Sequence, residues 1–135
     1  MKKHCIELDQ TRQFSKFFLD YIKGEPSLAP FYSHKPELGS FKNAIETKKF
    51  PAHNREILVR SLKKQYEGVE ISDAVVRNID SLAEQQTFTV ITGHQLNLFT
   101  GPLYFIYKIV STINLAKKLN ETYPDQHLVP VYWMA

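Results

Sequence analysis

The last fifty residues place the strongest constraint on how this chain can fold. Residues 86–135 carry only five of its 31 charged side chains, as an internal part of a fold would. Two runs rich in β-branched and aromatic residues, 87–92 and 128–134, flank a stretch from Pro102 to about Leu119 with helical periodicity. A strand, a helix and a second strand in this order predict a βαβ unit with parallel strands and a right-handed crossover.

The first 85 residues have a different character and hold the other 26 charges. Their apolar residues recur at helical spacing, and glycine, proline, serine and asparagine punctuate them. We expect helices from Asp9 or Thr11 to Gly24, over 41–48, from Asn54 to Tyr66 and from Ser72 onward, with an irregular loop over 25–39. The domain organisation predicted from this shift is a helical region over 1–85 followed by an α/β region over 86–135.

Two parallel strands do not form an independently stable sheet, so the α/β region is expected to be incomplete in this chain. The chain then represents the front piece of a larger α/β protein. An edge strand completed by a partner chain is the competing interpretation.

Composition excludes several classes of function. A net charge of +3 without a basic cluster argues against a nucleic-acid partner. No apolar run approaches the length of a membrane helix, and charged residues follow the basic N-terminus where a signal peptide needs an apolar core. The single cysteine cannot form an internal disulfide, which indicates a cytoplasmic protein. Histidines 4, 34, 53 and 127 show no metal-ligand spacing with one another or with the cysteine, so no metal site is predicted.

The candidate site is the loop 93–101, between the first predicted strand and the following helix. Free amides and the positive dipole end of a helix suit such a place to phosphate or carboxylate. Gly93 would let the chain turn off the strand, and Gly101 would let a ligand approach the helix. His94 and Gln95 can donate hydrogen bonds to an anion or to developing charge.

Two residues of the following helix extend this site. Lys108 lies six positions after Pro102, and helical side chains lean back toward the N-terminus, so its ammonium can approach the same anion. Tyr104, one turn earlier, would line the route. The spacing matches neither a Walker A loop nor G-x-G-x-x-G. A tight strand-to-helix connection with an ordinary hydrogen-bonded His94, and a solvated Lys108, therefore stay open as alternatives.

The run T-G-H-Q-L-N-L-F-T-G-P-L-Y-F-I-Y-K, residues 92–108, resembles the signature of the BshC family, the cysteine ligases of bacillithiol biosynthesis. A second match, V-P-V-Y-W-M-A over 129–135, resembles that family's V-P-V-[FY]-W-[MI]-A strand. The resemblance covers residues 87–135 firmly and the helical region only in general character. It implies a Rossmann-like domain, of which this chain would contain the first βαβ unit.

The resemblance also implies an activity, the addition of cysteine to glucosaminyl-malate in the last step of the pathway. Cysteine and glucosaminyl-malate are then the small-molecule partners, and a homodimer is an expectation for the full-length family. The activating cofactor is unknown, with ATP or another nucleotide expected, because a carboxylate must be activated before it joins an amine.

In relatives an acidic, histidine-containing stretch follows the W-[MI]-A strand, and this chain stops before it. We therefore expect the chain to be inactive alone. A non-catalytic α/β fragment that serves only as an interaction or assembly module is the alternative.

Within this interpretation, His94 and Gln95 are the predicted catalytic residues. The predicted anion-, nucleotide- or substrate-binding residues are Gly93, Asn97, Thr100, Gly101, Tyr104 and Lys108.

Overall fold

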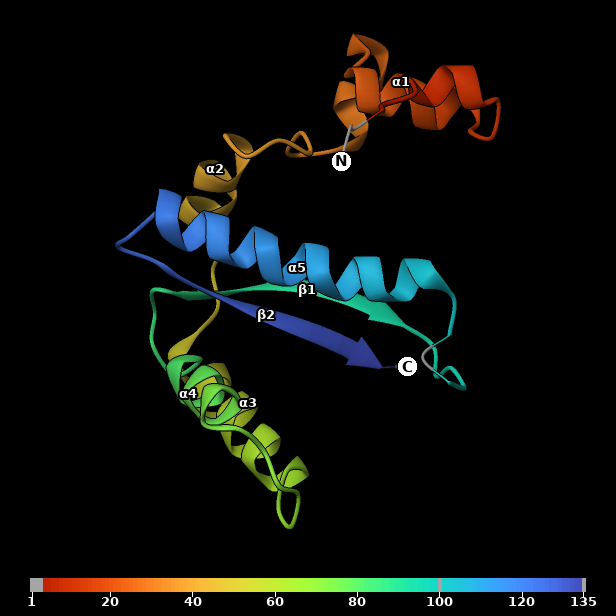
Figure 1. Cartoon of the computed structure of the whole chain (residues 1–135). Coiled ribbons are helices and arrows are strands. Elements are labelled where there is room, and N and C mark those ends of the chain that lie inside the picture. Colours follow the sequence, from red (N-terminus) through yellow and green to blue (C-terminus); the bar gives the residue numbers. More distant parts are fainter. Residues whose placement is uncertain (1–3, 100, 135) are drawn as a thin grey trace. The chain divides into compact units, whose positions relative to one another are not determined.

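A computed structural model describes residues 4–99 and 101–134 of the chain (Figure 1). Its contacts divide the chain into two compact units, one up to Lys48 and one from Lys49 onward. The boundary predicted near residue 85 rests on composition and stays a prediction. Among the described residues, no helix combines the length and the apolar character that crossing a bilayer requires.

The first unit is helical. It contains two 3₁₀ helices and two α-helices, which are η1 (Leu8–Thr11), α1 (Lys16–Lys23), η2 (Pro26–Phe31) and α2 (Ser40–Thr47). α1 begins later than Asp9 or Thr11, because the Ser15 hydroxyl caps it by accepting from the Phe18 amide at 3.2 Å. Gly24 ends α1 in the left-handed conformation, as predicted.

Aromatic residues hold part of this unit together. The Phe14 and Phe18 rings stack with centroids 4.9 Å apart, and Tyr21 meets Tyr32 edge-on at 5.4 Å. Tyr32 follows η2, so Tyr21 of α1 contacts the end of the proline-rich segment. That segment was expected to be irregular, but Pro26 begins a short 3₁₀ helix within it.

The second unit begins with two helices, α3 (Ala52–Gln65) and α4 (Asp73–Ser81), which contact each other. α3 starts two residues before the predicted cap Asn54, because Pro51 supplies the extended residue that precedes it. α4 starts after Ser72, as predicted.

A buried arginine links α3 to the elements that follow it. The Arg55 Nη1 donates to the carbonyl oxygens of Leu82 at 3.1 Å and Thr87 at 3.0 Å. Its Nη2 donates to the Gln85 carbonyl at 3.4 Å, and its guanidinium lies 5.5 Å from the centre of the Phe50 ring. This side chain therefore joins α3 to the end of α4 and to the start of the first strand. No pattern in the sequence predicts this role.

The strands β1 (Thr87–His94) and β2 (His127–Met134) pair in parallel, and α5 (Leu103–Thr122) connects them and contacts both. Figure 1 shows α5 running along the strand pair. The predicted βαβ unit is thus confirmed. The register runs from Thr87 opposite His127 to His94 opposite Met134, so β1 continues through residue 94 rather than ending at 92.

The buried apolar residues of this unit include Ala116 and Leu119 of α5 and Leu128 and Val129 of β2. Successive side chains of a strand point to opposite faces, so only one of Leu128 and Val129 can face α5. Asn120 fastens the end of α5 to the start of β2. Its Nδ2 donates to the Leu128 carbonyl at 3.0 Å, and its Oδ1 accepts from the Leu128 amide at 2.7 Å.

α5 also carries a second apolar stripe that the strands do not cover. Ile106, Val110 and Ile113 are 44%, 46% and 38% exposed. The apolar residues of α5 therefore divide between two sides of the helix. Ala116 is buried, whereas these three are not.

Candidate functional site

His94 is the last residue of β1, and its half-buried ring touches the first turns of α5. The ring Nε2 lies 2.7 Å from the Tyr104 Oη. Phe105 meets the same ring edge-on at 6.0 Å and in turn contacts Tyr132 of β2 at 5.4 Å. The histidine is therefore held between the strand that carries it and the helix that follows.

The other ring nitrogen of His94 faces the loop. Its Nδ1 lies 2.8 Å from the Asn97 Nδ2 and 3.0 Å from the Gln95 carbonyl oxygen. The Asn97 Nδ2 also donates to that carbonyl at 3.0 Å. Residues 94, 95 and 97 thus form a closed set of polar contacts within the loop.

Gly101 makes room for this arrangement. Its φ is +63°, a conformation that residues with a side chain rarely adopt. A Cβ at this position would lie 2.7 Å from both Cβ and Cγ of Asn97, closer than van der Waals contact allows. The space beside Gly101 is therefore taken by the Asn97 side chain. The approach of a ligand there stays a prediction.

Lys108 reaches the end of β1 from the second turn of α5, as the backward lean of helical side chains predicts. Its Nζ donates to the Gly93 carbonyl at 3.1 Å and lies 5.7 Å from the centre of the Tyr104 ring. Gly93 itself lies within β1. A Cβ there would approach the Trp133 carbonyl oxygen to 3.0 Å, so this glycine permits close contact with β2.

The structure thus brings His94, Asn97, Tyr104 and Lys108 together at the carboxyl end of β1. Gln95 contributes its backbone carbonyl to this cluster. Thr100 lies outside the described residues. Asn97 was predicted to belong to the site, but its contact with His94 was not predicted. Their spacing of three residues was the available signal.

The electrostatic setting favours an anion. The sequence has no aspartate or glutamate between Glu84 and Glu121. Among the first amides of α5, that of Phe105 donates to the Pro102 carbonyl at 2.9 Å, and the helix dipole places partial positive charge next to the cluster. The cluster combines the Lys108 ammonium with neutral polar groups, and its Lys108 and Asn97 donors bond to the carbonyl oxygens of Gly93 and Gln95. Such a set suits a phosphate or carboxylate oxygen.

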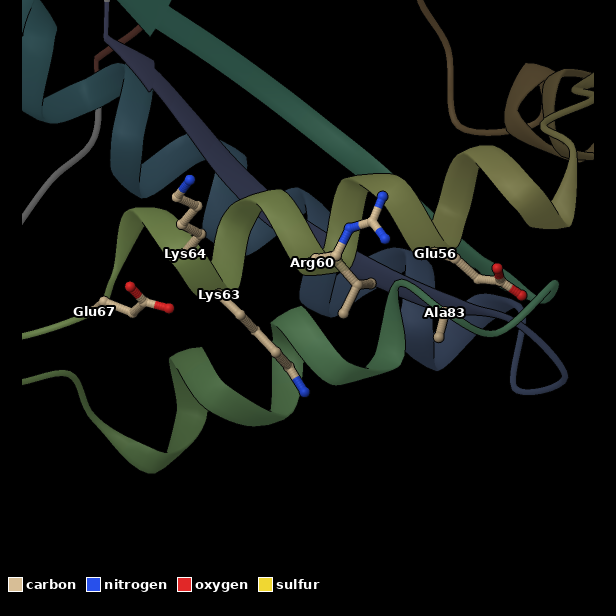
Figure 2. A pocket seen from close by; sticks show the side chains of 7 residues that line it. Glu56, Arg60, Lys63, Lys64, Glu67 and Ala83 are labelled. Atoms are coloured by element: carbon tan, nitrogen blue, oxygen red, sulfur yellow. The ribbon is translucent and has the colours of Figure 1, made fainter.

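A separate shallow hollow of about 530 Å³ lies along α3. Figure 2 shows the side chains around it, which come mainly from α3. Its lining residues are Glu56, Val59, Arg60, Lys63, Lys64, Glu67 and Ala83. Both charge signs are present, and the Lys63 ammonium pairs with Asp80 at 2.7 Å. The hollow therefore favours no particular class of ligand. Across residues 4–99 and 101–134, no three His, Cys, Asp or Glu side chains cluster as metal ligands would.

A parallel βαβ unit with polar side chains gathered where the first strand meets the helix is typical of Rossmann-like α/β proteins, a class that binds ligands at the carboxyl ends of its strands. The family model for the bacillithiol biosynthesis BshC N-terminal Rossmann-like domain matches residues 1–135. The chain belongs to the BshC family, and the resemblance found at 92–108 and 129–135 is confirmed.

Curated relatives agree with this assignment. A protein of Flavobacterium johnsoniae is 51% identical over 137 residues, and one of Flavobacterium psychrophilum is 50% identical over 138. Each match covers 100% of this chain and 26% of the relative. A Bacillus cereus protein is 32% identical over 116 residues, which cover 86% of this chain and 21% of the relative. All three are named "Putative cysteine ligase BshC". The chain thus spans about a quarter of the length of the two Flavobacterium relatives.

Proposed function

We propose that this chain forms the anion-binding edge of a ligase that adds cysteine to glucosaminyl-malate in the last step of bacillithiol biosynthesis. Family membership supports a ligase of this pathway. The substrates and the amide bond belong to the proposal. Anionic substrate groups would fit the edge of the sheet at the end of β1, because it offers hydrogen-bond donors and a cation.

Amide formation joins the cysteine carboxyl carbon to an amine nitrogen, and an oxygen of the carboxylate must leave. ATP or another nucleotide is the class of co-reactant that activates a carboxylate for this step. Both the nucleotide phosphates and the malate carboxylate are anions that the donor set at the end of β1 suits. Such a reaction would take place in the cytoplasm.

Each residue of the loop has a role in this proposal. His94 and Gln95 contact the anion, and Lys108 offsets its charge from the second turn of α5. Tyr104 lines the approach, and Gly93 and Gly101 allow the backbone to come close. Asn97 and Thr100 complete the binding loop.

One observation carries the proposal. The His94 ring, at the end of β1, lies beside two residues of α5. Its Nε2 is 2.7 Å from the Tyr104 Oη, and the Lys108 Nζ is 5.7 Å from the centre of the Tyr104 ring. No acidic residue in the sequence of this βα segment opposes their charge. An anion placed there would meet several donors at once.

The test uses the full-length protein that contains this segment. Product is measured by mass spectrometry after incubation with cysteine, glucosaminyl-malate and ATP. His94→Ala should reduce product formation on the order of a hundredfold, the usual loss when one catalytic donor is removed. Unchanged turnover would remove His94 from the site.

His127→Ala is the matched control. His127 is an exposed histidine at the opposite end of the same strand pair, and its backbone amide keeps its bond to the Gln86 carbonyl in the variant. Its rate should stay within about twofold of the unmodified protein, as for surface substitutions. A full-length protein that forms no amide product at all would favour the non-catalytic alternative.

A further inference from the structure

Phe105, in the first turn of α5, contacts aromatic rings on both strands. Its ring meets the His94 imidazole with centroids 6.0 Å apart and planes at 82°, and it meets Tyr132 at 5.4 Å and 85°. Perpendicular arrangements at such distances are among those that aromatic pairs prefer. In the register Tyr132 is opposite Thr92, which shares a face of β1 with His94. Phe105 therefore bridges the carboxyl ends of the two strands over the face that bears His94.

The polar partners of His94 are exposed side chains. The Asn97 Nδ2 lies 2.8 Å from Nδ1, and the Oη of Tyr104, which is 51% exposed, lies 2.7 Å from Nε2. Water competes with exposed hydrogen bonds, and the χ2 torsion of histidine has a broad intrinsic preference. The plane of the imidazole is therefore set in part by the groups that pack beside it. Phe105 is half-buried and has Tyr132 behind it, so its ring is well placed to act in this way.

We infer that Phe105 is a positioning residue that holds the plane of the His94 imidazole. A rotation of the imidazole about χ2 would break the perpendicular arrangement of the two rings, so their contact favours one plane. Tyr132 in turn supports the Phe105 ring, which links the orientation of His94 to the position of β2. The catalytic consequence rests on the function proposed above, in which His94 must be aimed at an anion. Such a site needs its groups held within about 10–20° of the productive direction.

The experiment measures the order of the His94 ring in the full-length protein. Solid-state NMR of the sedimented protein, labelled with ¹³C at Cδ2 of histidine, gives an order parameter for the Cδ2–Hδ2 bond. This bond points away from the χ2 axis and therefore reports rotation about it. The His94 signal is identified by its loss in His94→Gln. We expect about 0.85 in the unmodified protein, and a value below about 0.6 there would overturn the inference without any variant of Phe105 having to fold.

Phe105→Ala should lower this order parameter below about 0.6, because it opens space beside the imidazole. Phe105→Tyr keeps the ring and should restore the value of the unmodified protein. Phe88→Ala is the matched control, since Phe88 is a half-buried phenylalanine on the same face of β1, near the start of the strand. It removes the same side chain but no ring beside His94, so the order parameter should not change. Equal values in Phe105→Ala and Phe88→Ala would overturn the inference.

Tyr132→Ala tests the link to β2. It should also loosen the His94 ring, because Phe105 loses the ring behind it. Added to Phe105→Ala, the same change should have no further effect, since the bridge is already broken. An effect of equal size in both backgrounds would show that Tyr132 acts on His94 without Phe105, which would overturn the link.

The activity assay tests the catalytic consequence separately. Phe105→Ala should lower the rate of product formation about fivefold, the factor that one aromatic pair supplies. A loosened His94 ring in Phe105→Ala together with full activity of His94→Ala would refute the proposed function and leave the positioning role of Phe105. An unchanged ring in Phe105→Ala together with loss of activity in His94→Ala would refute the positioning role and leave the proposed function.

Discussion

Replacing Arg55 with methionine tests the link between α3, α4 and β1. Methionine has a long, unbranched and apolar side chain that can fill much of the same space. It cannot donate to the carbonyls of Leu82, Gln85 and Thr87, which Arg55 now satisfies. The side chain of Arg55 is only 6% exposed, so water reaches these acceptors poorly after the change.

The magnitude follows from the three bonds. Those to Leu82 at 3.1 Å and Thr87 at 3.0 Å are well formed, while the one to Gln85 at 3.4 Å is long and contributes little. Hydrogen bonds to a charged group are worth about 1.5–3 kcal/mol each. We use the lower value, because removing a buried charge whose Nε has no partner among the described residues recovers some desolvation cost. The expected loss is about 3 kcal/mol.

Hydrogen exchange followed by mass spectrometry measures this loss locally in the full-length protein. Peptides covering α4 and the start of β1 should exchange on the order of a hundredfold faster, the equivalent of about 3 kcal/mol. Arg60→Met is the matched control, since Arg60 lies on the same helix but is exposed. It should change local stability by less than about 0.5 kcal/mol. Equal protection in the two variants would refute the role given to Arg55.

Two further substitutions test contacts around α5. Gly101→Ala should displace Asn97 and destabilise the loop by about 2 kcal/mol, through a strained φ and a clash, as read from loop hydrogen exchange. Asn120→Ala should expose the start of β2, because it removes both bonds to the Leu128 backbone. At about 1 kcal/mol for each neutral bond, peptides from residue 127 onward should lose roughly 2 kcal/mol of protection.

Matched control variants separate these effects from a general loss of stability on substitution. Gly68 also has a positive φ, +75°, and no atom lies within 4 Å of the new Cβ, so Gly68→Ala introduces the backbone strain without the clash. If Gly68→Ala reduces local stability as much as Gly101→Ala does, then the space that Gly101 leaves for Asn97 does not explain the effect at position 101. Asn114→Ala, at an exposed asparagine on α5, should leave β2 unaffected. Alanine is a better helix former than asparagine, so a similar loss there would show that the Asn120 effect does not come from its two bonds to Leu128.

The βαβ unit could be predicted from sequence because its signals are local. Runs of β-branched residues define the strands, and helical periodicity defines α5. The position of Lys108 was also predictable, since the lean of helical side chains depends only on helix geometry. These predictions needed no knowledge of which distant residues meet.

Contacts between distant segments could not be derived in this way. Arg55 looks like any other basic residue of a charged helix, and nothing local shows that it meets carbonyls about thirty positions later. The start of α1 was misplaced for a different reason. Several residues there can cap a helix, and the left-handed turn at Arg12 decides in favour of Ser15.

The pairing of β1 with β2 sets His94 directly across from Met134. Neighbouring strands lie about 4.8 Å apart, so β2 ends within one strand spacing of His94. In a longer polypeptide, the segment after β2 would start from that place. No long excursion of the backbone is needed for downstream residues to join it. The alignment of two strands, as much as the loop between 93 and 101, therefore determines which parts of the polypeptide can share this edge.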